Sequence, residues 1–157
     1  MKSKKLKKIL FGGAIVAVIG ISVVLFILFR PHRDTQATPA DYTLTSTELV
    51  LESLDDTDAA NEKYLAEDGD SKIIAISGTV FSKEIDYDNN QVVLLKKEGD
   101  DAGVKCTFME NTNKNAVKLK IGDIVTIKGV YKIAASYDED FEEYGDVIFE
   151  ECDIINK

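Results

Sequence analysis

Residues 119–131, with the sequence LKIGDIVTIKGVY, restrict the fold of this chain more than any other stretch. The turn-forming pair Gly122-Asp123 leads into a strand in which apolar and polar residues alternate. Gly129 interrupts that strand, and a glycine inside a strand usually marks a bulge, a sharp bend or a close approach of another backbone. Residues 73–81 repeat the pattern with Gly78 in the equivalent position. Such strands are suited to the corners of a small, strongly coiled barrel.

The remaining strands complete a five-stranded barrel of the OB type. We expect strands at residues 73–84, 91–96, 104–109, 124–134 and 146–155, with residues 111–119 linking the third to the fourth. The fold class is therefore mainly β.

An amphipathic helix is predicted to precede the barrel and to close one of its open ends. Thr45 and Glu48 have the spacing of a capping box, and apolar residues including Leu49 and Val50 follow at helical spacing. Residues 55–58 are mostly aspartate and form helix poorly, so we expect a kink or a break there.

The first 33 residues predict a membrane anchor. Residues 1–8 carry five lysines, residues 9–29 have no charge, and Arg30 and Arg33 follow. A helix of this length spans ~31 Å, the thickness of a bilayer's hydrocarbon core. A cleaved signal peptide is the main alternative, but its apolar region would be about 7–15 residues long and would end at small residues.

The predicted organisation is a basic cytoplasmic tail (1–8), a transmembrane helix (9–29), a linker (30–44) and a helix-plus-barrel domain (45–157). The excess of lysines before the span favours a cytoplasmic amino terminus. We therefore expect a single-pass protein of the cell (inner) membrane whose carboxy-terminal domain is periplasmic or otherwise extracytoplasmic.

Five short segments occur in an order that resembles a known family. They are AANEKY at 59–64, IAISGTV at 74–80, VKCTF at 104–108, LKIGDIVTIKG at 119–129 and IFEECDI at 148–154. Together they resemble the tRNA-anti-like OB-fold domains of bacterial proteins, which are named for their similarity to anticodon-binding domains. The resemblance implies an OB barrel over about residues 45–155. Many members of this family look like small envelope proteins. It assigns no catalytic residue.

Charge and composition exclude several functions. Residues 34–157 contain 12 basic and 28 acidic residues, a net charge of −16 that repels nucleic acid and anionic membrane surfaces. The chain has no tryptophan, and its one histidine is His32. A Ser-His pair, a Cys-His pair or a histidine-ligated metal is therefore not expected in the folded domain, and we predict no enzymatic activity and no cofactor.

An OB barrel binds ligands across its second and third strands, between the loop joining strands one and two and the loop joining strands four and five. These loops are predicted at residues 84–90 and 137–146. The candidate ligand-binding residues are Tyr87, Lys96, Lys105, Tyr137, Phe141 and Tyr144. Nine carboxylates in the loops argue against a nucleic-acid ligand. We predict a binding module for an unknown protein or small ligand of the envelope, with nucleic-acid binding as the alternative.

The acidic loops leave cation binding open as a second alternative. The oxygen-bearing residues at alternate positions are Asp86, Asp88 and Asn90 in the first loop, and Asp138 and Asp140 in the second. The first loop lacks the central glycine and closing glutamate of an EF-hand, so solvated acidic loops are the simpler interpretation.

Cys106 and Cys152 are the only cysteines. They fall in the predicted third and fifth strands, which are neighbours in an OB barrel. A disulfide between them would suit an extracytoplasmic domain, and two buried reduced thiols are the alternative.

Overall fold

The computed structural model describes residues 18–25, 33–66 and 70–156 and divides the chain into two compact units, Met1–Arg33 and Asp34–Lys157. In the first unit, residues 18–25 are helical, and their apolar side chains, such as Ile21, are exposed. Across the described residues, no helix has the length and apolar character needed to cross a membrane. The predicted basic tail and most of the predicted span lie outside the described residues, so the anchor stays a prediction.

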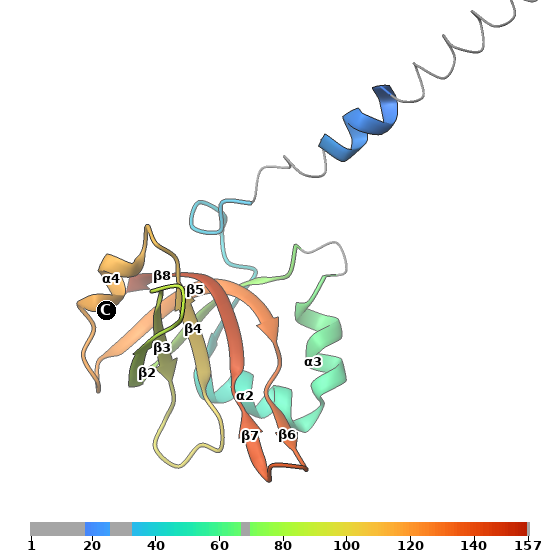
Figure 1. Cartoon of the computed structure of the whole chain (residues 1–157). Coiled ribbons are helices and arrows are strands. Elements are labelled where there is room, and N and C mark those ends of the chain that lie inside the picture. The colour runs from blue at the N-terminus through green and yellow to red at the C-terminus, as the bar shows by residue number, and fades with distance from the viewer. Residues whose placement is uncertain (1–17, 26–32, 67–69, 157) are drawn as a thin grey trace, which may run out of the picture. The chain divides into compact units, whose positions relative to one another are not determined.

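The second unit contains the predicted five-stranded barrel (Figure 1). Its strands are β2 (Ile73–Ile85), β3 (Gln91–Leu95), β4 (Val104–Phe108), β5 (Ile124–Ile133) and β8 (Val147–Asn156). They pair in the order β2-β3-β4-β8-β5, and pairing between β2 and β5 closes the sheet. This order is that of an OB barrel.

Strand β2 pairs with β5 along its first half and with β3 along its second half. Its first half pairs with β5, ending at Thr79 opposite Ile124, and its second half pairs with β3 from Val80 onward. A Cβ atom at Gly78 would lie 2.7 Å from Ser46 Oγ. Gly78, which has no side chain, therefore lies where another element approaches closely, as the sequence predicted.

Gly129 in β5 makes a second close approach. A Cβ atom there would lie 2.6 Å from Cys152 Sγ and 3.0 Å from Glu150 O of the neighbouring strand β8. The register between β5 and β8 also shifts on either side of this glycine. Gly129 thus lets the two strands coil tightly around the core.

The predicted helix is present as two helices, α2 (Ser46–Asp55) and α3 (Thr57–Tyr64). The capping box is confirmed: Glu48 N donates to Thr45 Oγ1 at 3.2 Å, and Thr45 N donates to Glu48 Oε2 at 2.8 Å. The helix breaks in the aspartate-rich segment, where Asp56 caps α3 by accepting from Ala59 N. Buried side chains of both helices join the barrel core.

The predicted linker is more structured than the sequence indicated. Tyr42–Thr45 form β1, which pairs in parallel with the start of β2. Gln36 Nε2 donates to Glu151 O at 2.7 Å, and Lys128 Nζ donates to Gln36 O at 2.8 Å and Thr38 O at 2.9 Å. Polar residues of the predicted linker thus bind the barrel wall, and the local sequence could not show this because their partners lie about ninety residues or more away.

Two further elements mark opposite ends of the barrel (Figure 1). The short helix α4 (Asn113–Val117) lies between β4 and β5, in the predicted linking segment. The predicted loop after β5 is instead a two-stranded ribbon, β6 (Ser136–Asp138) and β7 (Glu143–Gly145), which forms a sheet of its own.

We expect Gly129→Ala to lower the free energy of unfolding of residues 34–157 by about 1–3 kcal/mol, because the added methyl group overlaps β8 atoms. Urea denaturation measures this change. Cys152→Ala should reduce the cost of Gly129→Ala, since it removes the nearest atom, so the two substitutions should not be additive.

The matched control is Gly145→Ala, where the new Cβ would lie an ordinary 3.6 Å from Ser136 O. We expect Gly145→Ala to change stability by less than ~1 kcal/mol, in either direction, since it also restricts the unfolded chain. Equal effects of the two substitutions would contradict the close approach at Gly129.

Candidate functional site

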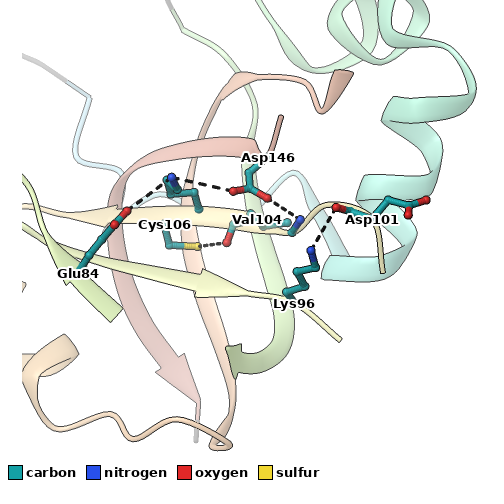
Figure 2. Close-up of polar contacts among 8 residues, drawn as sticks. Glu84, Lys96, Asp101, Val104, Cys106 and Asp146 are labelled. Carbon is teal, nitrogen blue, oxygen red and sulfur yellow. Dashed lines mark hydrogen bonds and ion pairs between the residues drawn. The ribbon is translucent and has the colours of Figure 1, made fainter. Parts of the chain in front are cut away.

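Lys105 lies on the outer face of the barrel between two carboxylates. Its Nζ is 3.5 Å from Glu84 Oε1 and 4.0 Å from Asp146 Oδ2 (Figure 2). Asp146 also fixes the base of the ribbon, because its Oδ1 accepts from Gly103 N at 2.8 Å. The cation that the sequence placed on the ligand face is therefore already compensated by its neighbours.

Lys96 follows β3 and is also engaged within the domain. Its Nζ donates to Asp101 O at 3.1 Å (Figure 2). The same atom lies 5.7 Å from the ring centroid of Phe81. Phe81 is half exposed beside the bulge in β2, between Val80 and Ser82. The sequence analysis missed it, because an aromatic residue in an apolar strand is normally assigned to the core.

The ribbon brings two of the predicted aromatic residues together. Tyr137 pairs with Tyr144 across the ribbon, with their ring centroids 4.8 Å apart. Phe141, in the turn between β6 and β7, is 76% exposed. Asp138 shapes this turn, since its Oδ1 accepts from Asp140 N at 2.9 Å. All six strand residues of the ribbon are exposed.

The ribbon is also the most acidic part of the barrel. Residues 136–146 contain six carboxylates and no lysine or arginine. In the described part of the chain, the ion pairs join other residues, apart from the contact of Asp146 with Lys105 at the ribbon base. The carboxylates beyond the base are thus exposed and have no cationic partner within the described ranges, and they favour a positively charged ligand.

Tyr87 does not join the ribbon aromatics. It is fully exposed in the turn between β2 and β3. That turn lies against α4, because Asn113 Nδ2 donates to Asn89 O at 3.1 Å and Asn113 Oδ1 accepts from Gln91 N at 2.8 Å. The predicted ligand residues therefore divide between the α4 end and the ribbon end of the barrel, and their role as one ligand face stays a prediction.

The turn that holds the first cation-binding candidates uses its own carboxylate internally. Asp86 Oδ1 accepts from Asp88 N at 2.9 Å and from Asn90 N at 2.8 Å. The hydrogen bond from the Asn90 backbone holds the pKa of Asp86 below its usual value. Among the described residues, no group of three or more His, Cys, Asp or Glu is placed to hold a metal ion.

Cys106 and Cys152 are buried and unbonded in the structure. They lie on the paired strands β4 and β8, where Cys152 is opposite Phe108. Burial, together with the neighbouring Cys106, raises the pKa of the Cys152 thiol well above its usual value. The predicted disulfide stays a prediction.

Comparison with known families decides the classification. The model of the tRNA_anti-like family matches residues 1–139. The chain belongs to this family. No curated protein matches the chain.

Solved structures with a similar fold include a protein described as a candidate nucleic acid-binding lipoprotein of Klebsiella pneumoniae. It is 14% identical, with a TM-score of 0.53, and the match covers 76% of this chain and 100% of that one. Two OBodies, NL8 and AM3L09, each bound to hen egg-white lysozyme, are 24% and 23% identical, with TM-scores of 0.38 and 0.39. Both matches cover 55% of this chain, with 97% of the NL8 chain and 83% of the AM3L09 chain. The likeness to the Klebsiella pneumoniae protein supports the fold alone.

We expect both thiols to be inert in the native domain, because burial hinders access and the raised pKa of Cys152 disfavours the reactive thiolate. Ellman's reagent should titrate no thiol of residues 34–157 in buffer and both thiols in urea. If no thiol reacts in urea until a reductant is added, the pair is a disulfide. Rapid reaction in buffer would contradict the burial of both sulfurs.

Proposed function

We propose that this chain is a non-enzymatic binding module of the cell envelope that recognises a cationic segment of a protein partner. The observation that carries the proposal is the ribbon, in which exposed aromatic rings stand beside carboxylates that have no cationic partner among the described residues. Aromatic rings and carboxylates together suit lysine and arginine side chains, through cation–π contact and charge attraction.

The backbone of the ribbon supports a polypeptide ligand. The ribbon is a sheet of two strands, so each strand has a free edge, to which an extended peptide can add by main-chain hydrogen bonds. A two-stranded ribbon is only marginally stable alone. A partner strand would therefore stabilise the ribbon and gain specificity from Tyr137, Tyr144 and Phe141.

Nucleic-acid binding is the second candidate function. It is favoured by the structural neighbour described as a candidate nucleic acid-binding protein. The charges oppose it, because Lys105 lies between Glu84 and Asp146 and the domain carries a net charge of −16. A polyanion would have to displace these internal contacts before it gained its own.

The burial of the two cysteines supports the part of the proposal that the chain has no enzymatic activity. Both cysteines are buried, and the pKa of Cys152 is raised rather than lowered as it would be in a catalytic thiol. His32, the one histidine, lies outside the described residues.

Membrane anchoring by residues 9–29 predicts that the full chain stays in the membrane pellet after an alkaline wash, since a spanning helix is held by its apolar length. Protease added to spheroplasts should digest residues 34–157 if the domain is extracytoplasmic. Release by the alkaline wash would disprove the anchor. Retention together with protection until the cells are lysed would place the domain in the cytoplasm.

For the ribbon, we expect residues 34–157 to bind a lysine-rich peptide that contains one aromatic residue, and to bind a single-stranded oligonucleotide of equal charge number much more weakly. Fluorescence anisotropy of the labelled probes gives both affinities. Peptide binding should weaken as salt is raised, because exposed charges are screened over ~8 Å at physiological ionic strength.

The variant E139Q/D140N/E142Q removes three ribbon carboxylates and should weaken peptide binding at least about tenfold, if each contributes ~0.5–1 kcal/mol. The control E62Q/E98Q/E110Q makes the same change of net charge at exposed positions elsewhere and should leave the affinity within about twofold. Equal losses in the two variants would show attraction by net charge alone. Preferential binding of the oligonucleotide would favour the nucleic-acid alternative.

A further inference from the structure

The end of the barrel opposite the ribbon exposes a group of lysine and aliphatic side chains, named here the α4–β5 face. Its members are Lys114, Val117, Lys118, Lys120, Ile121 and Ile124. The first three are spaced i, i+3 and i+4, so they share one side of α4. The three apolar members are among the most exposed of the domain, at 60%, 71% and 74% for Val117, Ile121 and Ile124.

The fold holds these side chains outward. The intervening Ala116 and Leu119 are buried in the barrel core. Lys83 Nζ donates to Val117 O at 3.1 Å and to Leu119 O at 2.8 Å, and Gly122 N donates to the backbone of β2 at 2.8 Å. The backbone of this segment is thus tied to β2 at several points, and the exposed apolar residues cannot turn inward without breaking these bonds.

The α4–β5 face lies beside the point where the chain enters the barrel. Asn115 Nδ2 of α4 donates to Asp153 Oδ1 at 2.8 Å, and two residues earlier in β8 Glu151 O accepts from Gln36 Nε2. Two residues of strand span only ~7 Å. Helix α4 and the clamped segment 34–38 are therefore neighbours on β8, and residues 9–29 precede that segment by only a few residues in sequence.

The local charge of this face differs from that of the whole domain. Residues 111–124 contain three exposed lysines and one acid, Asp123. Neighbouring elements add Asp86 and Asp88, in the turn against α4, and Asp153, which accepts from Asn115. The ten residues of β5 run from Ile124 toward the ribbon side of the barrel over at most ~30 Å, at ~3.4 Å per residue. Exposed charges more than ~8 Å apart are largely screened at physiological salt, so the ribbon carboxylates weaken the attraction of these lysines for nearby anions only slightly.

We propose that the α4–β5 face docks on the anionic lipid surface of the membrane that anchors the chain. The lysines lie against lipid phosphates, while Val117, Ile121 and Ile124 enter the boundary between headgroups and acyl chains. This proposal rests on the proposed function, because the membrane anchor is what would bring the domain close to a bilayer. Docking at this end turns the ribbon away from the bilayer, toward a partner in the envelope.

Vesicle sedimentation tests the docking with residues 34–157, which form a compact unit with its own closed core. We expect binding to vesicles containing phosphatidylglycerol and none to pure phosphatidylcholine. K114Q/K118Q/K120Q should lower the partition coefficient at least about tenfold, because each lysine near an anionic surface adds a several-fold factor. The control K72Q/K97Q/K132Q, with the same loss of charge elsewhere, should stay within about twofold of the parent domain.

The orientation of the docked domain can be read directly. A polarity-sensitive dye attached at Ile121→Cys should shift to shorter wavelength on anionic vesicles, and the same dye at Glu139→Cys on the ribbon should not shift. The native thiols are buried and should not be labelled. The double variant I121S/I124S should reduce binding with its charge unchanged, which separates insertion of apolar groups from charge attraction alone.

The proposal is wrong if the domain ignores anionic vesicles, if it binds both lipids equally, if the two lysine variants behave alike, or if the ribbon dye shifts instead. Dimerisation lost in I121S/I124S, without vesicle binding, would instead assign this face to a second copy of the chain. Because residues 1–33 are absent from these experiments, failure of the docking is distinct from failure of the anchor, which the alkaline wash of the full chain tests.

Discussion

Pairing between β2 and β5 closes the barrel, and the other features of the domain depend on this closure. Each of these two strands also packs tightly against a third element at a glycine. Gly78 leaves room for Ser46 at the start of α2, and Gly129 leaves room for Cys152 of β8. A side chain at Gly129 would overlap atoms of β8. The closed barrel has two distinct ends, and the exposed charged and apolar side chains differ between them.

The charges of the domain are separated along the barrel. The net charge of −16 of residues 34–157 conceals an acidic ribbon at one end and, at the other, a face with three exposed lysines and three exposed aliphatic residues. Between the ends, the lysines of the outer face are held by nearby oxygens, as Lys105 is by Glu84 and Asp146. On this arrangement we base the proposals that the ribbon binds a cationic ligand and that the α4–β5 face binds an anionic surface.

The clamped segment before β1 is held by the barrel strands. Gln36 and Lys128 exchange hydrogen bonds between the segment and β5, and Gln36 also binds β8. Residues 34–38 are therefore part of the folded domain.

The sequence by itself determined the elements with local signals: the five strands, the capping box of Thr45 and Glu48, the break at Asp56 and the two glycine positions. These depend on alternation, spacing and backbone freedom within a few residues. Only the tertiary structure decided which distant groups meet. The sequence did not show that Lys105 lies beside Asp146. It also did not show that residues 36 and 38 of the predicted linker form hydrogen bonds with β5 and β8. The exposure of Phe81 and Ile124 was equally hidden, because a strand pattern identifies apolar residues without showing which of them the core has room to bury.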